Sequence, residues 1–225
     1  LHRVLGTWKN KVSVYIALTE FQKQKMIEDG LPSDKILIKP NFIQKPEGSE
    51  QNVAEEEAQT SSSKPQTPYC LFVGRLSPEK GCDVLIRAWN IYVSKLQTSI
   101  PKRKEAGAKH QQQSGNLEST PHLLIVGDGP ERENLESLIA INDESSPVHF
   151  LGLKSKKEVL SLMSNARFLV QPSLWYEGFP MTIVESFACG TAVVASDTGS
   201  MTSIIRHREN GLKFEGGNSE ALAEQ

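Results

Sequence analysis

The sequence contains little cysteine, carries little net charge and has no long apolar run. Its three cysteines, Cys70, Cys82 and Cys189, lie far apart, which fits neither a disulfide framework nor a cysteine-based zinc site. We therefore expect buried thiols in a reducing compartment, and hence a cytoplasmic protein. The formal net charge of -2 provides no general attraction to nucleic acid, so no such partner is expected and any phosphate site must be local.

No stretch approaches the roughly 18 apolar residues that a membrane-spanning helix needs. The chain begins at Leu1, without an initiator methionine or a signal-peptide pattern. It stops at Gln225, soon after Asn218 begins a further helical pattern. We therefore expect the sequence to be a piece of a longer protein, truncated at both ends.

Short apolar runs alternate with helical patterns, which is typical of βαβ units around a parallel sheet. Residues 1–43 predict a strand at 12–18, a helix at about 20–29 with Thr19 as its N-cap, and a short strand at 36–38. After the elements of residues 1–43 comes a longer series of five strand–helix alternations. This series predicts an α/β fold with a doubly wound, parallel, Rossmann-like sheet. Its predicted strands are 69–73, 122–126, 148–151, 166–171 and 192–195, and its predicted helices are 81–96, one beginning at Pro130, 155–164 and 181–189.

Two polar stretches interrupt these elements. Residues 44–67 are rich in glutamate and serine, and we expect a disordered hinge or linker there. Residues 98–121 are predicted to form a flexible insertion outside the sheet. The basic triplet at 102–104 is either an interaction site or part of a solvated loop.

Ligands of open parallel sheets bind beyond the carboxyl ends of the strands, so the loops at that edge are the first candidates for a site. The loop after the first strand of the longer series carries Gly74, Arg75 and Lys80. Two cations beside a helix start can hold a diphosphate, although a surface loop with solvated cations explains this spacing equally well. The turn at Gly127 permits close approach by a ligand, and a plain tight turn is the alternative.

The most informative loop follows the strand that ends at Gln171. It carries Glu177, and the helix that begins near Pro180 carries Glu185, eight positions after the first glutamate. A carboxylate among aromatic side chains needs a polar partner, and sugar hydroxyls are a natural one, while free N–H groups at the helix start can face a phosphate. The alternative is that Glu185 lies on a solvent face and Glu177 is a charge at the helix start.

Several ordered segments resemble glycosyltransferase family four, the retaining GT-B enzymes known as glycosyl transferases group 1. Residues 18–43 resemble the end of the family's N-terminal domain, and 177–196 resemble its Glu-x7-Glu signature. The other matching segments are 71–89, 124–135, 148–152 and 211–218. The resemblance implies a GT-B type fold, in which 1–43 is the remnant of a truncated Rossmann-like acceptor domain and 68–225 binds the donor.

The resemblance also implies roles for individual residues. Arg75 and Lys80 would bind the donor diphosphate and stabilise the charge that builds there as the glycosidic bond breaks. Glu177 would bind hydroxyls of the donor sugar and would be catalytic together with these two cations, whereas Glu185 would bind the ribose. Further donor contacts would come from Gly74, Gly127, Gly178, Phe179, Pro180, Met181 and Thr182, with Leu151 near the base.

By this resemblance the protein is a hexosyltransferase that uses a UDP- or GDP-linked sugar and retains anomeric configuration. It implies no metal ion or other cofactor, and the sequence has no Asp-x-Asp pair. A glycan, lipid or small-molecule acceptor would bind the missing part of the N-terminal domain. The fragment alone is therefore expected to be inactive, and the full-length protein to lie in the cytoplasm, either free or peripherally at the inner face of the membrane.

The sequence departs from the family pattern at two positions. Ser203 stands where the family usually has an acidic residue, and Ala192 replaces a common proline. A catalytically inactive module that only binds a nucleotide sugar is the alternative function. A GT-B epimerase is a third hypothesis, but the five scattered histidines do not predict the cleft rich in histidine and acid that it should have.

Overall fold

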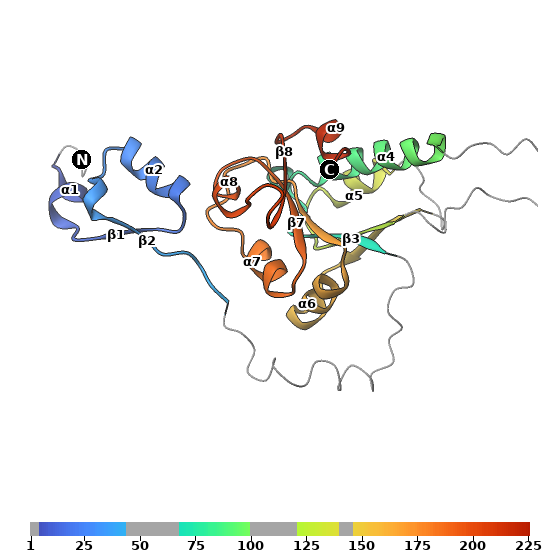
Figure 1. The fold of residues 1–225 in the computed structure, drawn as a ribbon, viewed down its shortest axis with the longest axis horizontal. Helices are drawn as coiled ribbons and strands as arrows, with labels where there is room; N and C mark the ends of the chain where they lie inside the picture. Colours follow the sequence, from blue (N-terminus) through green and yellow to red (C-terminus); the bar gives the residue numbers. More distant parts are fainter. Residues whose placement is uncertain (1–4, 44–67, 100–120, 140–145) are drawn as a thin grey trace, which may run out of the picture.

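The computed structural model describes residues 5–43, 68–99, 121–139 and 146–225 (Figure 1). They form a small N-terminal unit and a larger α/β domain. The predictions for 44–67 and for most of 98–121 fall outside the described residues.

The N-terminal unit, residues 5–43, is a two-stranded parallel sheet with short helices. Thr19 caps α2 as predicted, because its hydroxyl oxygen accepts a hydrogen bond from the N–H of Gln22 at 3.2 Å. The strand predicted at 12–18 has only three residues, and the first helix was not predicted. The elements are α1 (Thr7–Lys11), β1 (Tyr15–Ala17), α2 (Glu20–Glu28), η1 (Ser33–Lys35) and β2 (Ile36–Ile38).

The larger domain is built on a six-stranded parallel sheet with the order β5-β4-β3-β6-β7-β8. The chain moves outward from β3 to β5 and then returns to the other side of β3, which is the doubly wound Rossmann order. This order confirms the predicted fold class. The strands are β3 (Tyr69–Val73), β4 (His122–Val126), β5 (Val148–Gly152), β6 (Phe168–Gln171), β7 (Ala192–Ser196) and β8 (Gly211–Phe214). The helices are η2 (Pro78–Lys80), α4 (Cys82–Ser99), α5 (Arg132–Ser137), α6 (Lys156–Asn165), α7 (Met181–Ala188), α8 (Met201–Ile204) and α9 (Ser219–Leu222).

Two apolar cores cover the two faces of this sheet. Alternate residues of β3 point to opposite faces. Cys70 and Phe72 belong to the core beneath α4, α5 and α9, whereas Tyr69 and Leu71 belong to the core beneath α6, α7 and α8. Figure 1 shows α4 and α5 on one side of the sheet and α6 and α7 on the other. Because both faces are covered, the strands are near-continuous apolar runs. The loops at the edges of the sheet are therefore anchored to a well-packed core.

In the larger domain, α4 and β8 differ from the predictions. Helix α4 continues to Ser99 and Pro121 is buried, so the two ends of the predicted insertion at 98–121 belong to the larger domain. Strand β8 was not predicted, because a four-residue segment that contains Gly211 and Lys213 carries a weak strand signal.

Two glycines allow the loops at the carboxyl edge of the sheet, where the strands end, to touch one another. Gly81 has a φ of 65°, and a Cβ there would lie 2.2 Å from the carbonyl oxygen of Pro172. Gly127 has a φ of 137°, and a Cβ there would lie 1.8 Å from the carbonyl oxygen of Gly74. Only glycine fits these positions, and as a result the loops that leave β3, β4 and β6 pack backbone against backbone.

Candidate functional site

The loops that leave β3 and β6 meet where the strand order reverses, which is where open α/β sheets bind ligands. They comprise residues 74–81 and 172–180. The N–H of Leu174 in the second loop donates to the carbonyl oxygen of Glu79 in the first at 2.9 Å. The two loops therefore form one continuous surface at the carboxyl edge of the sheet.

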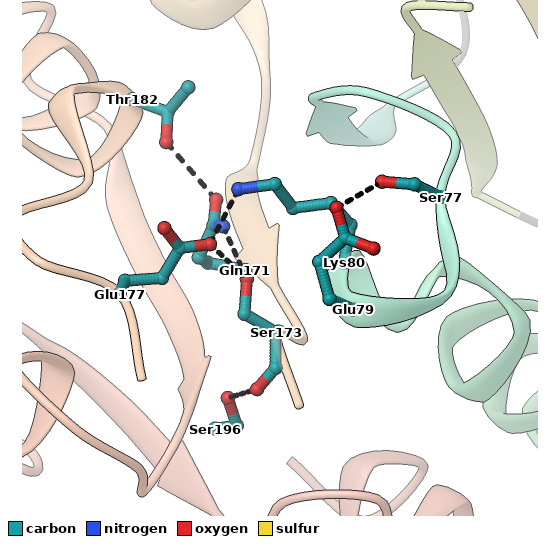
Figure 2. A network of polar contacts seen from close by, with 8 residues as sticks. All are labelled: Ser77, Glu79, Lys80, Gln171, Ser173, Glu177, Thr182 and Ser196. Carbon is teal, nitrogen blue, oxygen red and sulfur yellow. Dashed lines mark hydrogen bonds and ion pairs between the residues drawn. The ribbon is translucent and has the colours of Figure 1, made fainter. Parts of the chain in front are cut away.

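Lys80 and Glu177 form an ion pair between these two loops (Figure 2). Nζ of Lys80 lies 2.6 Å from Oε1 of Glu177, and the two side chains are 26% and 21% exposed. Salt screens such a pair less than one on the open surface. The structure thus brings together two residues that the sequence pattern had selected separately, and Glu177 is more than a solvated charge at a helix start.

Buried polar side chains fix the carboxylate of Glu177 from the ends of β6 and β7 (Figure 2). The hydroxyl of Ser173 donates to Oε1 of Glu177 at 2.8 Å and accepts from Nε2 of Gln171 at 2.9 Å. Thr182 donates to Oε1 of Gln171 at 3.1 Å. Ser196 donates to the carbonyl oxygen of Ser173 at 2.6 Å, and neither serine is exposed. The carboxylate is therefore held in place rather than free to rotate.

Sequence reasoning missed the supporting role of Gln171 and Ser173. The available signal was the position of two polar residues at the end of the apolar strand β6. Buried polar side chains need hydrogen-bond partners, so polar residues at that position indicate a network. The sequence does not show which loop completes it. Thr182 was expected to contact the donor, and in the structure it also supports Gln171.

Arg75 lies on the same loop as Lys80, with an exposed side chain. Between them in sequence, the carboxylate of Glu79 accepts a hydrogen bond from the hydroxyl of Ser77 at 2.6 Å. This bond lowers the pKa of Glu79, and the charges of Arg75 and Lys80 lower it further. The loop thus presents two cations beside one carboxylate that is ionised at neutral pH.

Glu185 lies inside α7 and is only 8% exposed, so the interpretation that it sits on a solvent face is wrong. Its carboxylate pairs with Nζ of Lys156, the first residue of α6. Leu151 belongs to β5, the strand that precedes α6, and is partly buried. Sequence reasoning missed Lys156, because neither periodicity nor spacing links a helix start to a position in a later helix.

The start of α7 contains the remaining predicted contacts. Pro180 is its N-cap residue and makes no side-chain cap, and the first N–H groups of any helix lack partners inside the helix. The predicted contacts form one continuous segment directly after Glu177, in which a short irregular stretch leads into the first residues of α7; they are Gly178, Phe179, Pro180, Met181 and Thr182. They lie beside the ion pair, where free N–H groups can face an anion.

All three cysteines are free. Burial raises the pKa of the Cys70 and Cys82 thiols to about 12, so both are protonated and unreactive at neutral pH. Cys189 is partly exposed, and the expectation of three buried thiols is wrong for this residue.

Within the residues that the structure describes, no three His, Cys, Asp or Glu side chains are placed to hold a metal ion. In the same described ranges, no helix combines the length and apolar character needed to cross a bilayer.

The family model described as "Glycosyl transferases group 1" matches residues 53–225. An uncharacterised glycosyltransferase of Methanocaldococcus jannaschii is 33% identical over 153 residues, which cover 68% of this chain and 33% of that protein. A D-inositol 3-phosphate glycosyltransferase of Acidothermus cellulolyticus is 32% identical over 152 residues, which cover 65% of this chain and 30% of that protein. This chain therefore spans about a third of the length of these relatives.

A solved structure covers nearly the whole chain. HepE of Anabaena, in complex with UDP and glucose, matches with a TM-score of 0.68 and 22% identity. The match covers 99% of this chain and 55% of HepE. At this identity the likeness concerns the fold, and it agrees with the expected fold class.

Proposed function

The chain belongs to group 1 of the glycosyl transferases, and from this premise we propose that it forms the donor site of an enzyme that transfers a hexose from a nucleoside diphosphate sugar, with retention of anomeric configuration. In this proposal residues 68–225 bind the donor, and residues 1–43 are the end of the acceptor domain of a GT-B enzyme.

The ion pair of Lys80 with Glu177 carries this proposal. It places an ammonium group and a carboxylate side by side where the strand order reverses. A nucleoside diphosphate sugar offers a diphosphate and sugar hydroxyls next to one another. Lys80 and Arg75 would bind the diphosphate, and Glu177 would accept hydrogen bonds from the hydroxyls. The diphosphate of the ligand then replaces Glu177 as the partner of Lys80. The sugar hydroxyls replace Lys80 as the partner of Glu177.

The same residues would promote the transfer. When the bond between the sugar and the diphosphate breaks, the electron pair leaves with the diphosphate oxygen. Lys80, Arg75 and the N–H groups at the start of α7 would stabilise this charge, since all of them are in place before the reaction. Hydrogen bonds from the hydroxyls to Glu177 would strengthen as the ring becomes positively charged, which favours the transition state over the ground state.

The nucleoside would extend from this pair toward β5. Glu185 would accept hydrogen bonds from the ribose, while Leu151 would lie near the base and Gly127 and Gly74 along the pocket. Lys156 would keep Glu185 in place. The complex of HepE with UDP and glucose supports a UDP-hexose as the first donor to test, with GDP-linked sugars next.

The remaining parts of the proposal concern the full-length protein. We propose that transfer needs no metal ion, that a glycan, lipid or small-molecule acceptor binds outside this chain, and that this chain alone is inactive. We also place the reaction in the cytoplasm, either free or at the inner face of the membrane.

The test is thermal unfolding of the full-length protein with UDP, GDP, ADP and their glucose conjugates. One nucleotide should stabilise the protein, by about 2.7 kcal/mol at a ligand concentration of 100 times Kd. NMR of the transferred sugar then gives its anomeric configuration. Stabilisation by none of these nucleotides would contradict the proposal. Nucleotide binding without transfer of the sugar to any acceptor would favour the inactive binding module.

A further inference from the structure

The backbone carbonyl oxygen of Gly178 is held by two side chains from outside its own loop. Nε2 of Gln22, in α2, donates to it at 3.0 Å, and the hydroxyl of Ser200, at the start of α8, donates at 2.7 Å. Gly178 directly follows Glu177, so both bonds hold the backbone one residue after the one that bears this carboxylate. The N-terminal unit and the larger domain therefore meet at the loop that carries Glu177.

Buried hydroxyl groups continue this contact into the N-terminal unit. Oγ1 of Thr19 lies 3.0 Å from Oγ of Ser200, and these residues are 5% and 0% exposed. Thr19 is also the N-cap of α2. The start of α2 is thus fixed against the start of α8 by the same side chain that initiates the helix.

The amide of Gln22 connects two backbones. Its Oε1 accepts from the N–H of Leu18 at 2.8 Å, and its Nε2 donates to Gly178. Beside it, the ring of Phe21 packs edge-on against Tyr176, with centroids 4.9 Å apart and planes at 68°. A Cβ at position 178 would lie 3.0 Å from Nε2 of Gln22, so glycine at this position permits the close approach.

The preceding part of this loop is largely exposed, although Tyr176 contacts Phe21. Leu174, Trp175 and Tyr176 are 39%, 71% and 67% exposed. Loops with few buried apolar contacts open at low free-energy cost, so individual hydrogen bonds have a large effect on their geometry. The bonds to Gly178 are therefore well placed to determine where the Glu177 carboxylate lies.

We propose that Gln22 and Ser200 are positioning residues, and that they form a latch through which the N-terminal unit sets the geometry of the donor site. This role rests on the proposed function, in which Glu177 binds the donor sugar. With the unit docked, the carbonyl of Gly178 is held from both sides and Glu177 is oriented. When the unit moves away, the bonds from Gln22 and Thr19 are lost and the loop relaxes.

The substitution Gln22→Glu tests the latch in the full-length enzyme. It preserves side-chain size and the acceptor for Leu18, but it places a carboxylate oxygen against the Gly178 carbonyl. Gln24→Glu is the matched control, since it adds the same charge to an exposed position of the same helix, where the amide donates a hydrogen bond to Glu28 and not to the described residues of the larger domain. Turnover, the Kd for UDP and amide hydrogen exchange of residues 175–179 are measured for both variants.

In Gln22→Glu, we expect kcat to fall on the order of tenfold, the Kd for UDP to stay within about twofold of wild type, and the loop amides to exchange faster. Gln24→Glu should match wild type in all three measurements. Ser200→Ala should behave like Gln22→Glu, and it decides the question if the latter does not fold. If the amides of residues 175–179 exchange at the same rate in Gln22→Glu and Ser200→Ala as in Gln24→Glu, the latch is overturned. If instead the wild-type enzyme transfers no sugar, the proposed function fails, while the exchange comparison still decides the latch.

Discussion

Nζ of Lys80 lies 2.6 Å from Oε1 of Glu177, and these two opposite charges neutralise each other in the free protein. A ligand that binds Lys80 must replace the carboxylate of Glu177 as its partner. A ligand that binds Glu177 must replace the ammonium group of Lys80. A ligand that offers only one of the two partners leaves the other half-buried charge without compensation. The pair therefore favours ligands in which an anion and several hydroxyl groups are adjacent, as in a nucleoside diphosphate sugar.

Glu177→Ala in the full-length enzyme should reduce kcat on the order of ten- to several-hundred-fold, which corresponds to about 1.4–3.5 kcal/mol of lost transition-state stabilisation. Stability should fall by only about 1–2 kcal/mol, because Lys80 and Ser173 lose a partner but the main apolar cores are untouched. Steady-state kinetics and urea unfolding measure the two effects. Wild-type turnover, or activity lost only through unfolding, would make Glu177 a structural charge.

Lys80→Ala should weaken binding of UDP or GDP even when no sugar is attached, by about tenfold or more, because a charged hydrogen bond contributes about 1.5–3 kcal/mol. Glu177→Ala should bind the same nucleotide at least as tightly as wild type, since Lys80 no longer has to leave a carboxylate. Isothermal titration calorimetry of both variants separates phosphate recognition from sugar recognition. Equal losses of affinity in the two variants would argue against this division of roles.

Lys156→Met should lower the free energy of unfolding by about 1–3 kcal/mol, because it leaves the buried residue Glu185 without its cation. Lys157→Met removes a neighbouring exposed lysine from the same helix and should change stability little. Adding Glu185→Gln to Lys156→Met should recover part of the loss. Urea unfolding measures all three, and identical values for the two lysine variants would show that the pair is not stabilising.

The rings of His122 and His149 stack at 4.8 Å, and Nε2 of His149 lies 2.9 Å from Nδ1 of His122. Burial lowers the pKa of both rings, and the charge of His149 lowers that of His122 further. The unfolded chain therefore binds protons more readily. The contribution of the two histidines to the free energy of unfolding is fully present above the unfolded pKa of about 6.5. It is lost as the pH falls below that value.

We accordingly expect the Tm to decrease when the pH is lowered from about 7.5 to about 5.5. The decrease should be smaller in His149→Phe. Phenylalanine keeps a ring stacked on His122 but does not bind a proton. Thermal unfolding followed by circular dichroism at both pH values gives the comparison. The same decrease in wild type and variant would exclude the histidine pair as its source.

The architecture of the larger domain was predictable because buried parallel strands are near-continuous apolar runs, and these are easy to find in a sequence. β3, β4, β5 and β7 agree with the predictions to within a residue, whereas the short edge strand β8 did not stand out. The sequence also allowed Lys80 and Glu177 to be placed at one edge of the sheet, since both follow strand ends.

Contacts between side chains that are far apart in sequence could not be predicted in the same way. Lys156 and Glu185 meet because α6 and α7 pack side by side on one face of the sheet. The bond from Gln22 to Gly178 depends on how the N-terminal unit docks. No pattern within either segment encodes such pairings, because they arise from the packing of whole elements.

The strand order also places the connection from α4 to β4 at the edge of the sheet opposite the proposed donor site. The chain leaves α4 at Ser99 and re-enters the sheet through Pro121, at the amino edge of β4. Lys80 and Glu177 lie at the opposite, carboxyl edge. We expect a fluorescent protein or affinity tag inserted between 100 and 120 to be attached at the amino edge of the sheet, away from the proposed sugar site. This connection is a suitable fusion point for immobilising the enzyme or following it in cells while its donor site stays accessible.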